Sequence, residues 1–400
     1  MSARRNVAAL AVCQGLLVTN NIAVISIGSL AGYMLAANKA LSTLPATAYI
    51  AGGALSTYPI SLFMKRHGRR AGFTLGAAAG LLGALICTLA VAAGSFALFC
   101  LGTFIAGTYT ASGGYYRFAA ADAVGMGFKS RAISLVLAGG ILGGILGPES
   151  SKLTKDWLPV TFMGSYAALM AFALIVIAIL RLVDLPMPSE HERSGPSRPL
   201  PAIVRQPVFA VACLSAVTAY AVMNLLMGVT PLAMQMCALP YASAALVIEW
   251  HIISMFAPAL IVGSLVHRFG ALKVMAAGLL TYLACVLAAV TGQSVLHFWM
   301  SGTLLGIGWC LLYVGATTLL TDAYAPAEKA KTQGINDTLV FVVMATSNAL
   351  SGAILYRYGW NALNYSALPL LLATAVAVGW LALARRALRA NTAPVPTILE

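Results

Sequence analysis

The chain has 400 residues, of which 60% are hydrophobic and only 9% are charged. So few charged side chains cannot cover a water-soluble surface, and the composition therefore excludes a soluble globular protein and points to a chain surrounded by lipid. The formal net charge of +13 would suit a nucleic-acid-binding protein only if the basic residues gathered on one soluble face.

Twelve apolar segments follow one another along the chain, and each is close to or above the roughly 20 residues that cross a hydrocarbon core. Because lipid offers no hydrogen bonds to backbone groups, each segment is expected to be a helix. The segments are residues 7–35, 44–64, 71–93, 96–120, 132–151, 160–183, 207–234, 242–266, 273–292, 296–321, 332–354 and 361–384. The predicted fold class is an all-α membrane protein with twelve transmembrane helices.

A long polar stretch, residues 184–206, is rich in proline and charge and predicts a cytoplasmic linker between two bundles of six helices. The predicted domains are an N-terminal bundle at residues 1–183, this linker, a C-terminal bundle at 207–384 and a cytoplasmic tail at 385–400.

The distribution of basic residues predicts the topology. With the N-terminus in the cytoplasm, only Lys39, Lys152, Lys155 and Arg357 of the 24 Lys and Arg residues fall on the outer side. The positive-inside rule then places both termini in the cytoplasm. The net charge is thus explained by topology rather than by nucleic acid, and we expect a multi-pass protein of the bacterial inner membrane.

Signals for catalysis and metal binding are missing from the sequence. The seven cysteines all lie in apolar segments, with no CxxC and no pairing with histidine, which predicts buried thiols and no metal site. A G-x-x-x-x-G-K-[ST] phosphate loop, paired carboxylates, a histidine cluster and a serine elbow are also missing. We therefore expect no enzyme activity and no cofactor.

The sequence repeats itself at an offset of about 200 residues. Gly102-Thr103, Asp122-Ala123 and Lys129-x-Arg131 recur as Gly302-Thr303, Asp322-Ala323 and Lys329-x-Lys331. Each pair occupies the same place in its six-helix half, which indicates duplication and fusion.

Two loops carry a resemblance to a known family. The loop SLFMKRHGRR at residues 61–70 resembles the signature loop of the major facilitator superfamily, G-x-L-x-D-[RK]-x-G-[RK]-[RK], and GSLVHRFG at residues 263–270 resembles its second copy. The resemblance covers nearly the whole chain. It implies two pseudo-symmetric six-helix bundles that rock around a midplane cavity, as in a monomeric secondary transporter of a small-molecule substrate.

Both loops depart from the family pattern at the same place, because Lys65 and His267 stand where it has an acidic residue. We expect the acid to have moved to the ends of the fourth and tenth segments, so that Lys65 pairs with Asp122 and His267 with Asp322. The alternative is that these acids merely end helices in the headgroup region. The predicted cytoplasmic charge lock comprises Lys65, Arg66, Asp122, His267, Arg268 and Asp322.

The fifth segment carries Gly139, Gly143 and Gly147 at four-residue spacing, followed by Pro148. Small residues on one helical face let two backbones approach, and the proline supplies a bend. The run resembles the motif of the superfamily's antiporters, although Glu149-Ser150-Ser151 replaces its trailing glycines. Helix packing alone is the other interpretation.

Ionisable residues inside apolar segments are candidates for proton coupling, because a charge at membrane depth costs at least about 2.5–3.5 kcal/mol. Glu249 and His251 in the eighth segment are the candidates, although residues two apart project from nearly opposite helix faces. Buried hydrogen-bonding residues are the alternative. The pair Asn336-Asp337 in the eleventh segment ranks below Glu249, because it also fits an inner-end hydrogen-bonding cluster.

Arg117 follows the aromatic Tyr115 and Tyr116, which together suit an anionic or planar substrate. The alternative is an arginine that extends to the membrane interface as a topology anchor. The resemblance also implies that the first, fourth, seventh and tenth segments line the cavity. Their further polar and aromatic candidates, each equally suited to helix packing, are Gln14, Asn20, Asn21, Tyr220, Asn224, Trp309 and Tyr313.

The predicted function is secondary active transport of a small organic solute coupled to protons, with a slight preference for export by proton antiport. A proton-coupled importer of a nutrient, vitamin or siderophore is the alternative. Two other classes stay open: a non-transporting membrane receptor or sensor, and the membrane subunit of an ATP-driven importer.

Overall fold

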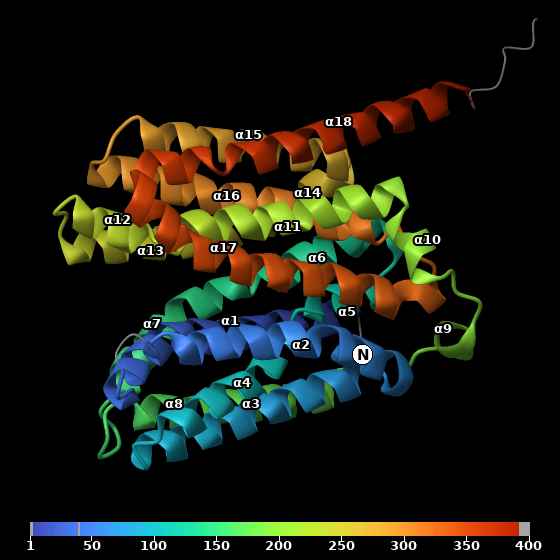
Figure 1. Cartoon of the computed structure of the whole chain (residues 1–400). Coiled ribbons are helices and arrows are strands. Elements are labelled where there is room, and N and C mark those ends of the chain that lie inside the picture. The colour runs from blue at the N-terminus through green and yellow to red at the C-terminus, as the bar shows by residue number, and fades with distance from the viewer. Residues whose placement is uncertain (1–2, 39–40, 392–400) are drawn as a thin grey trace, which may run out of the picture.

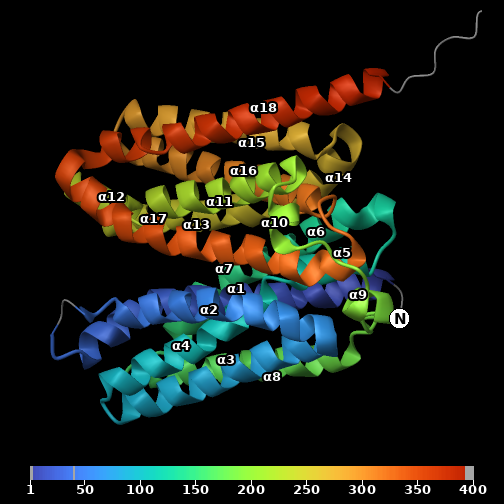
Figure 2. The same ribbon diagram turned by 45° about the vertical axis from the view of Figure 1, so that its right-hand side comes forward.

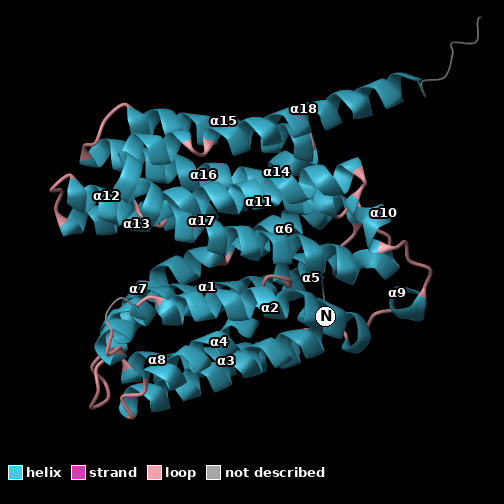
Figure 3. Cartoon of the chain, in the orientation of Figure 1, coloured by secondary structure: helices cyan, strands magenta, loops and turns pink. Residues whose placement is uncertain are grey.

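The computed structural model describes residues 3–38 and 41–391, and within them the chain forms helices and loops but no strand (Figure 3). The helices gather into two groups, one with the N-terminal helices and one with the C-terminal helices (Figure 1). The linker crosses from one group to the other beside the N-terminus. We call this end of the molecule the linker end and the opposite end the far end.

The N-terminal bundle is made of helices that follow the first six predicted segments. They are α1 (Ala3–Leu35), α2 (Leu44–His67), α3 (Arg69–Ala92), α4 (Phe96–Gly113) with α5 (Tyr116–Asp122), α6 (Lys129–Ala138) with α7 (Gly140–Thr154), and α8 (Met163–Leu182). The short 3-10 turn η2 (Met126–Phe128) leads into α6. The linker carries two short helices, α9 (Glu190–Ser194) and α10 (Leu200–Val204).

The C-terminal bundle follows the remaining six segments. Its helices are α11 (Pro207–Met227) with α12 (Thr230–Met236), α13 (Tyr241–Phe256) with α14 (Ala259–Phe269), α15 (Ala271–Val290), α16 (Val295–Leu320), α17 (Lys329–Tyr365) and α18 (Leu368–Asn391). The turn η3 (Pro326–Glu328) precedes α17. Because α18 continues to Asn391, the predicted tail is helical where it begins, and its residues 392–400 lie outside the described part.

Ten stretches of the described chain are long and apolar enough to cross a membrane. The predicted count of twelve differs for two reasons. Helix α2 is not among the ten, and residues 326–387, which hold both α17 and α18, count as one stretch. The all-helical membrane fold agrees with the prediction, while the count of twelve spans stays a prediction.

Four of the first ten predicted segments are broken into two helices each, at small residues or proline. The breaks fall near Gly114, Gly139, Gly228 and Pro258. Glycine and proline weaken or remove the intrahelical hydrogen bond at such points, so the helix can change direction there. Hydropathy cannot reveal these breaks, because the apolar run continues through them.

The glycines of the fifth segment face α1. A Cβ at Gly139 would lie 2.0 Å from the Ala11 carbonyl oxygen, and at Gly143 it would lie 2.5 Å from Val18 Cβ. At Gly147 it would lie 2.9 Å from Ile22. The run therefore brings α7 into close backbone contact with α1, as the packing interpretation expects. Pro148 lies inside α7, which continues to Thr154.

The two repeated loops have the same backbone shape. Gly68 has φ 86° and ψ 161°, and Gly270 has φ 86° and ψ 153°. Each glycine ends one helix and precedes the next, and this region of φ and ψ is open essentially only to glycine. The repeat seen in the sequence is thus also a structural repeat.

The two bundles come together at the linker end and diverge toward the far end, as α2 and α17 show in Figure 2. Helix α6 of the first bundle also packs against α14 of the second. Ser130 Oγ donates to the Gly263 carbonyl at 2.9 Å, and Gly263 N donates to Ser134 Oγ at 2.9 Å. The bundle interface is therefore closed by specific polar contacts near the linker end.

Candidate functional site

A cluster of amides and hydroxyls lies inside the N-terminal bundle. Asn21 Oδ1 on α1 accepts hydrogen bonds from the Tyr49 hydroxyl of α2 and, at 2.5 Å, from the Thr110 hydroxyl of α4. Asn20 Nδ2 donates to the Tyr49 hydroxyl at 3.2 Å. Asn20 is buried and Asn21 is half-buried. Asn20 and Asn21 were predicted, whereas Tyr49 of the second segment and Thr110 of the fourth were not among the candidates.

The C-terminal bundle contributes an aromatic cluster, formed by Tyr220 of α11, Phe256 of α13, and Trp309 and Tyr313 of α16. The Tyr220 ring stands perpendicular to Trp309 at 5.4 Å and to Tyr313 at 5.0 Å between centroids. Trp309 stacks on Tyr313 at 5.1 Å, and Phe256 lies 5.7 Å from Trp309. These are the edge-to-face and offset arrangements that aromatic rings favour. Tyr220 is half-buried and forms the accessible member of the cluster.

One polar atom in this cluster lacks a partner. Trp309 is 1% exposed, and its Nε1–H has no hydrogen-bond acceptor among the described residues. A buried donor without a partner costs about 1–3 kcal/mol, so such groups in native structures call for an explanation. A carbonyl oxygen of a bound molecule could accept this hydrogen bond.

A buried ion pair joins the two bundles next to the aromatic cluster. Arg117 of α5 donates through Nη2 to both carboxylate oxygens of Asp337 of α17, at 2.7 and 2.8 Å. The two side chains are 4% and 7% exposed. The Arg117 guanidinium also lies over the Tyr313 ring, 5.0 Å from its centroid. Asn336 Nδ2 donates to Asp337 Oδ1 at 2.8 Å.

Arg117 is therefore neither exposed at the interface nor free for an anion, since Asp337 holds it. Tyr115 is buried and donates its hydroxyl to the Thr57 carbonyl at 3.0 Å. The sequence did not reveal the partner of Asp337. The signal was an acid within the eleventh apolar segment, but its partner is 220 residues away in the sequence.

An ion network closes the linker end. Asp122 pairs with Arg69 of α3 at 3.3 Å and with Lys329 of α17 at 3.2 Å, and Lys329 also pairs with Glu192 of the linker at 2.9 Å. Arg69 donates to Gln333 Oε1 at 2.6 Å. We call these residues the linker-end network. It ties α3 and α5 of the first bundle to α17 of the second, with the linker as a third partner.

The predicted pairs of the charge lock were wrong. Asp122 pairs with Arg69 and Lys329 rather than Lys65, because a guanidinium at the start of α3 can bind Asp122 and Gln333 together. Asp322 pairs with Arg385 of α18 at 3.4 Å rather than with His267. The His267 ring instead lies beside Gly127, in the loop before α6.

Arg66 and Arg268, the other two basic residues of the predicted charge lock, also form no ion pair among the described residues. Arg66 is exposed, and the Arg268 guanidinium lies over the ring of Phe269, 5.2 Å from its centroid.

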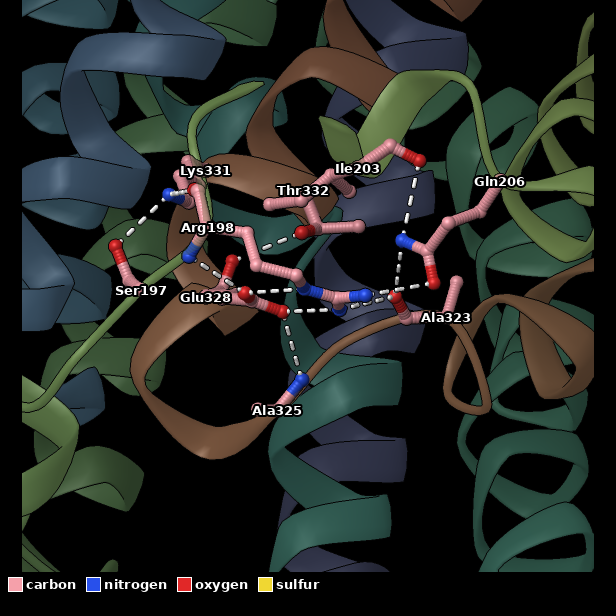
Figure 4. A network of polar contacts seen from close by, with 9 residues as sticks. All are labelled: Ser197, Arg198, Ile203, Gln206, Ala323, Ala325, Glu328, Lys331 and Thr332. Atoms are coloured by element: carbon pink, nitrogen blue, oxygen red, sulfur yellow. Dashed lines mark hydrogen bonds and ion pairs between the residues drawn. The ribbon is translucent and has the colours of Figure 1, made fainter. Parts of the chain in front are cut away.

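The linker is anchored to the C-terminal bundle by a second cluster, which we call the linker clamp (Figure 4). Glu328 of η3, 1% exposed, accepts hydrogen bonds from Arg198 Nε at 2.7 Å, from Arg198 Nη2 at 2.6 Å and from the Arg198 backbone N at 2.9 Å. Gln206 Nε2 donates to the Ala323 carbonyl at 3.0 Å. The Arg198 hydrogen bonds lower the pKa of Glu328 to about 2, so the clamp is charged at neutral pH.

The two proton-coupling candidates, Glu249 and His251, take part neither in the Arg117–Asp337 pair nor in the linker-end network. His251 is 2% exposed, its Nδ1 lies 2.8 Å from the Gly302 carbonyl oxygen, and its Nε2 has no partner among the described residues. Glu249 is exposed and makes no hydrogen bond or ion pair in the described part of the chain. The two side chains differ in surroundings as their spacing predicts.

The remaining cavity candidates have modest roles in the structure. Asn224 Nδ2 donates to the Tyr220 carbonyl at 2.9 Å, which is a contact within α11. Gln14 is half-buried, and no hydrogen bond to its side chain is found among the described residues. The structure therefore brings the rings of Tyr220, Trp309 and Tyr313 together, whereas the side chains of Gln14 and Asn224 make no hydrogen bond to another helix among the described residues.

The comparisons with known proteins agree on one family. A family model described as Major Facilitator Superfamily matches residues 212–399. The riboflavin transporter RfnT of Brucella anthropi is 37% identical over 374 residues, which cover 92% of this chain and 94% of the relative. The chain belongs to the major facilitator superfamily. The uncharacterized MFS-type transporter YdeG of Bacillus subtilis is 28% identical, over 85% of this chain and 83% of its own.

Solved structures share the fold at lower identity. FucP in the outward conformation matches with a TM-score of 0.76 and 16% identity, over 94% of this chain and 98% of that chain. The human organic anion transporter MFSD10 matches with a TM-score of 0.72 and 13% identity, over 94% and 100% of the two chains. These structures agree in fold, and the family membership shown by the 37% identical relative makes this chain a multi-pass secondary transporter and not an enzyme. The receptor and ATP-driven alternatives are set aside.

Proposed function

We propose that this superfamily member imports riboflavin or a closely related flavin. The observation that carries the proposal is the 37% identity to the riboflavin transporter RfnT over nearly the full length of both chains. The proposal adopts the importer alternative in place of the export preference. That preference depended on the glycine run of the fifth segment, whose glycines pack against α1.

The aromatic cluster supports a flavin as the substrate. A flavin has a flat, fused heteroaromatic ring with carbonyl oxygens and a chain of hydroxyl groups. Tyr220, Trp309 and Tyr313 offer ring faces and edges, and the unpaired Nε1–H of Trp309 suits a ring carbonyl. The amide and hydroxyl cluster around Asn21 suits the hydroxylated chain, because each of its groups can both donate and accept hydrogen bonds.

The bundle arrangement supports alternating access with the linker end in the cytoplasm. The positive-inside distribution of Lys and Arg favours this orientation and a bacterial inner membrane. In the described state the linker end is closed by charged contacts, while the bundles diverge at the far end. Inward opening then requires the Arg117–Asp337 pair and the linker-end network to break, as rocking of the two halves demands.

Proton coupling fits the Arg117–Asp337 pair better than Glu249 or His251. Protonation of Asp337 would remove the charge that holds Arg117 across the bundle interface, and it would lower the barrier to inward opening. Glu249 stays the alternative carrier, since it is an acid within a membrane-spanning helix without an ion-pair partner in the described chain.

The test is uptake of radiolabelled riboflavin by a bacterial riboflavin auxotroph that expresses this chain. We expect saturable uptake that unlabelled riboflavin competes away and that collapses when an ionophore removes the proton gradient. Trp309→Phe keeps an aromatic side chain but removes the N–H together with the pyrrole half of the indole, and we expect it to raise KM by about tenfold. Thr281→Val, which removes an exposed hydroxyl of α15, is the control. Absence of riboflavin uptake by a correctly inserted protein would refute the proposal.

A further inference from the structure

A cavity of about 340 Å³ lies at the linker end, between the two bundles and beneath the linker. Its walls come from α2, α3, α5 and α6 on one side and from the η3 turn and α17 on the other. Leu185, Pro186, Pro188 and Glu192 of the linker complete it. The volume falls at the lower end of the roughly 300–1,000 Å³ of small-molecule sites. None of the aromatic residues proposed to contact riboflavin, Tyr220, Trp309 and Tyr313, lines this cavity.

The charges that line the cavity do not balance. Four lining residues are basic, namely Lys65, Arg69, Lys129 and Lys329, and two are acidic, namely Asp122 and Glu192. Arg69 and Lys329 are the cations that pair with the acids. Lys65 and Lys129 have no ion-pair partner within the described residues, and both are half-buried. Two positive charges therefore remain uncompensated in a partly enclosed space.

We propose that this cavity binds a phosphate-bearing anion between Lys65 and Lys129. Free phosphate carries a charge of about −1.5 to −2 at neutral pH, close to that of the two surplus lysines, and the phosphodiester of a lipid headgroup offsets one of them. Ammonium groups bind phosphate as point charges. Low-dielectric walls focus the field of these charges and raise the local concentration of anions. The source of the phosphate group is either a free cytoplasmic anion or the headgroup of an anionic lipid.

Such a ligand would act on the transport cycle. Lys65 and Lys129 belong to the first bundle, whereas Pro326, Lys329 and other wall residues belong to the second, so opening of the linker end dismantles the cavity. A ligand that binds only one of two states shifts the equilibrium toward that state by its differential affinity. The anion therefore holds the linker end closed and slows turnover.

Thermal unfolding of the detergent-solubilised full chain tests binding without reference to the transported substrate. Inorganic phosphate is titrated against chloride at matched ionic strength, and the rise in Tm gives an apparent Kd. We expect Lys129→Gln and Lys65→Gln each to raise this Kd by about tenfold, since each removes one charged hydrogen-bonding partner. Lys273→Gln, which removes an exposed lysine of α15 outside the cavity, should leave it unchanged.

Phosphate also stabilises proteins nonspecifically by exclusion from their surface, and that effect is common to all variants. An equal rise in Tm for the wild type and all three variants would therefore overturn the proposal. The source is distinguished by repeating the titration with phosphatidylglycerol and phosphatidylcholine in mixed micelles. Lysine-dependent stabilisation by phosphatidylglycerol, but not by free phosphate, identifies a lipid headgroup. No lysine-dependent effect of either probe refutes the site.

The consequence for turnover is tested in proteoliposomes with the stabilising probe on both faces. We expect it to slow riboflavin entry severalfold for the wild type and markedly less for Lys129→Gln. This second measurement rests on the proposed function, whereas the Tm measurement does not. Lysine-dependent binding with no riboflavin entry would overturn the flavin assignment and leave the anion site standing. Lysine-dependent binding with equal inhibition of both proteins would overturn the effect on turnover.

Discussion

The two halves of the chain contain the same loop and the same acid after it, but they use them differently. In the first half, Asp122 pairs across the bundle interface with Lys329. In the second half, the equivalent Asp322 pairs with Arg385 of its own bundle. The symmetric counterpart of the first pair, Lys129 with Asp322, is not an ion pair in the described structure. The closure of the linker end is thus asymmetric although the fold is not.

The asymmetry extends into the membrane-spanning region. Arg117 crosses the interface to Asp337, whereas Thr317 stands at the equivalent place 200 residues later. In both interface pairs, the first half supplies a residue whose repeat equivalent in the second half does not cross the interface. Arg117 and Asp122 belong to the first half, and their partners Asp337 and Lys329 belong to the second. Variants at equivalent positions should therefore differ in effect.

The largest effect is expected for Arg117→Met, which leaves the buried Asp337 without its cation. Removal of one partner of a buried ion pair costs about 3–5 kcal/mol of folding free energy. Thr317→Val should cost less than about 1.5 kcal/mol, because it removes only a neutral hydroxyl. Thermal unfolding of the solubilised proteins measures both. The double variant Arg117→Met with Asp337→Leu should recover most of the stability without recovering uptake. A double variant that transports normally would contradict the role of the pair in the cycle.

The next effect concerns the linker clamp and depends on pH. The hydrogen bonds from Arg198 depress the pKa of Glu328 to about 2 from its ordinary value of 4.5. Stability from this group is therefore present above pH 4.5 and is lost as the pH falls toward 2. Because Arg198 is 46% exposed, we expect Glu328→Gln to lower the free energy of unfolding by only about 1–2 kcal/mol at pH 7. The difference between the two proteins should shrink below pH 4.5 in thermal unfolding, and a constant difference down to pH 3 would contradict the mechanism.

A smaller effect separates the two equivalent acids. Asp122→Asn removes two ion pairs whose side chains are at most 24% exposed, and we expect it to destabilise the closed linker end by about 1 kcal/mol. Asp322 is 57% exposed, so Asp322→Asn should change the uptake rate little. Riboflavin uptake by the two variants at equal expression provides the comparison. Equal losses would show that the closure is symmetric after all.

The smallest effect is expected for Arg385→Gln. It removes the partner of Asp322, and a pair this exposed contributes about 0–1 kcal/mol. This variant tests whether the two halves can close in the same way. Without Arg385, Asp322 is free to pair with Lys129, as Asp122 pairs with Lys329. If uptake slows in Arg385→Gln and recovers in the double variant with Lys129→Gln, the missing symmetric pair is accessible to the protein. Unchanged uptake in both variants would show that it is not.

The sequence predicted the helices well because hydrophobicity is a local property. Each apolar run reports its own environment, and the repeat and the loops at residues 61–70 and 263–270 identified the family. The break at Gly139 could not be read, because many membrane helices continue through a glycine. Trp309 and Tyr313 could be paired by their helical spacing of four, but the perpendicular Tyr220 ring depends on how α11 packs on α16.

The partners of charged residues were the hardest to predict. Lys65 and Arg69 lie four residues apart and are equally plausible partners of Asp122 in the sequence. The structure selects Arg69, which lies beyond the turn at Gly68 and contacts both Asp122 and Gln333. Similarly, Arg117 and Asp337 meet only because the two bundles dock. Such pairs depend on tertiary geometry that no single stretch of sequence contains.

The left-handed glycines at positions 68 and 270 set a limit on how far the duplicated halves can diverge. Charges around them have been exchanged, yet the backbone at both sites still excludes side chains, at a strain of about 1–3 kcal/mol for any other residue. A library of all single substitutions should therefore show two intolerant positions about 200 residues apart, with Gly68 the stricter, because a Cβ there would also lie 2.8 Å from Met187 Sδ while nothing lies within 4 Å of one at Gly270. In this protein the ancestral duplication is preserved more strictly in conformation than in chemistry.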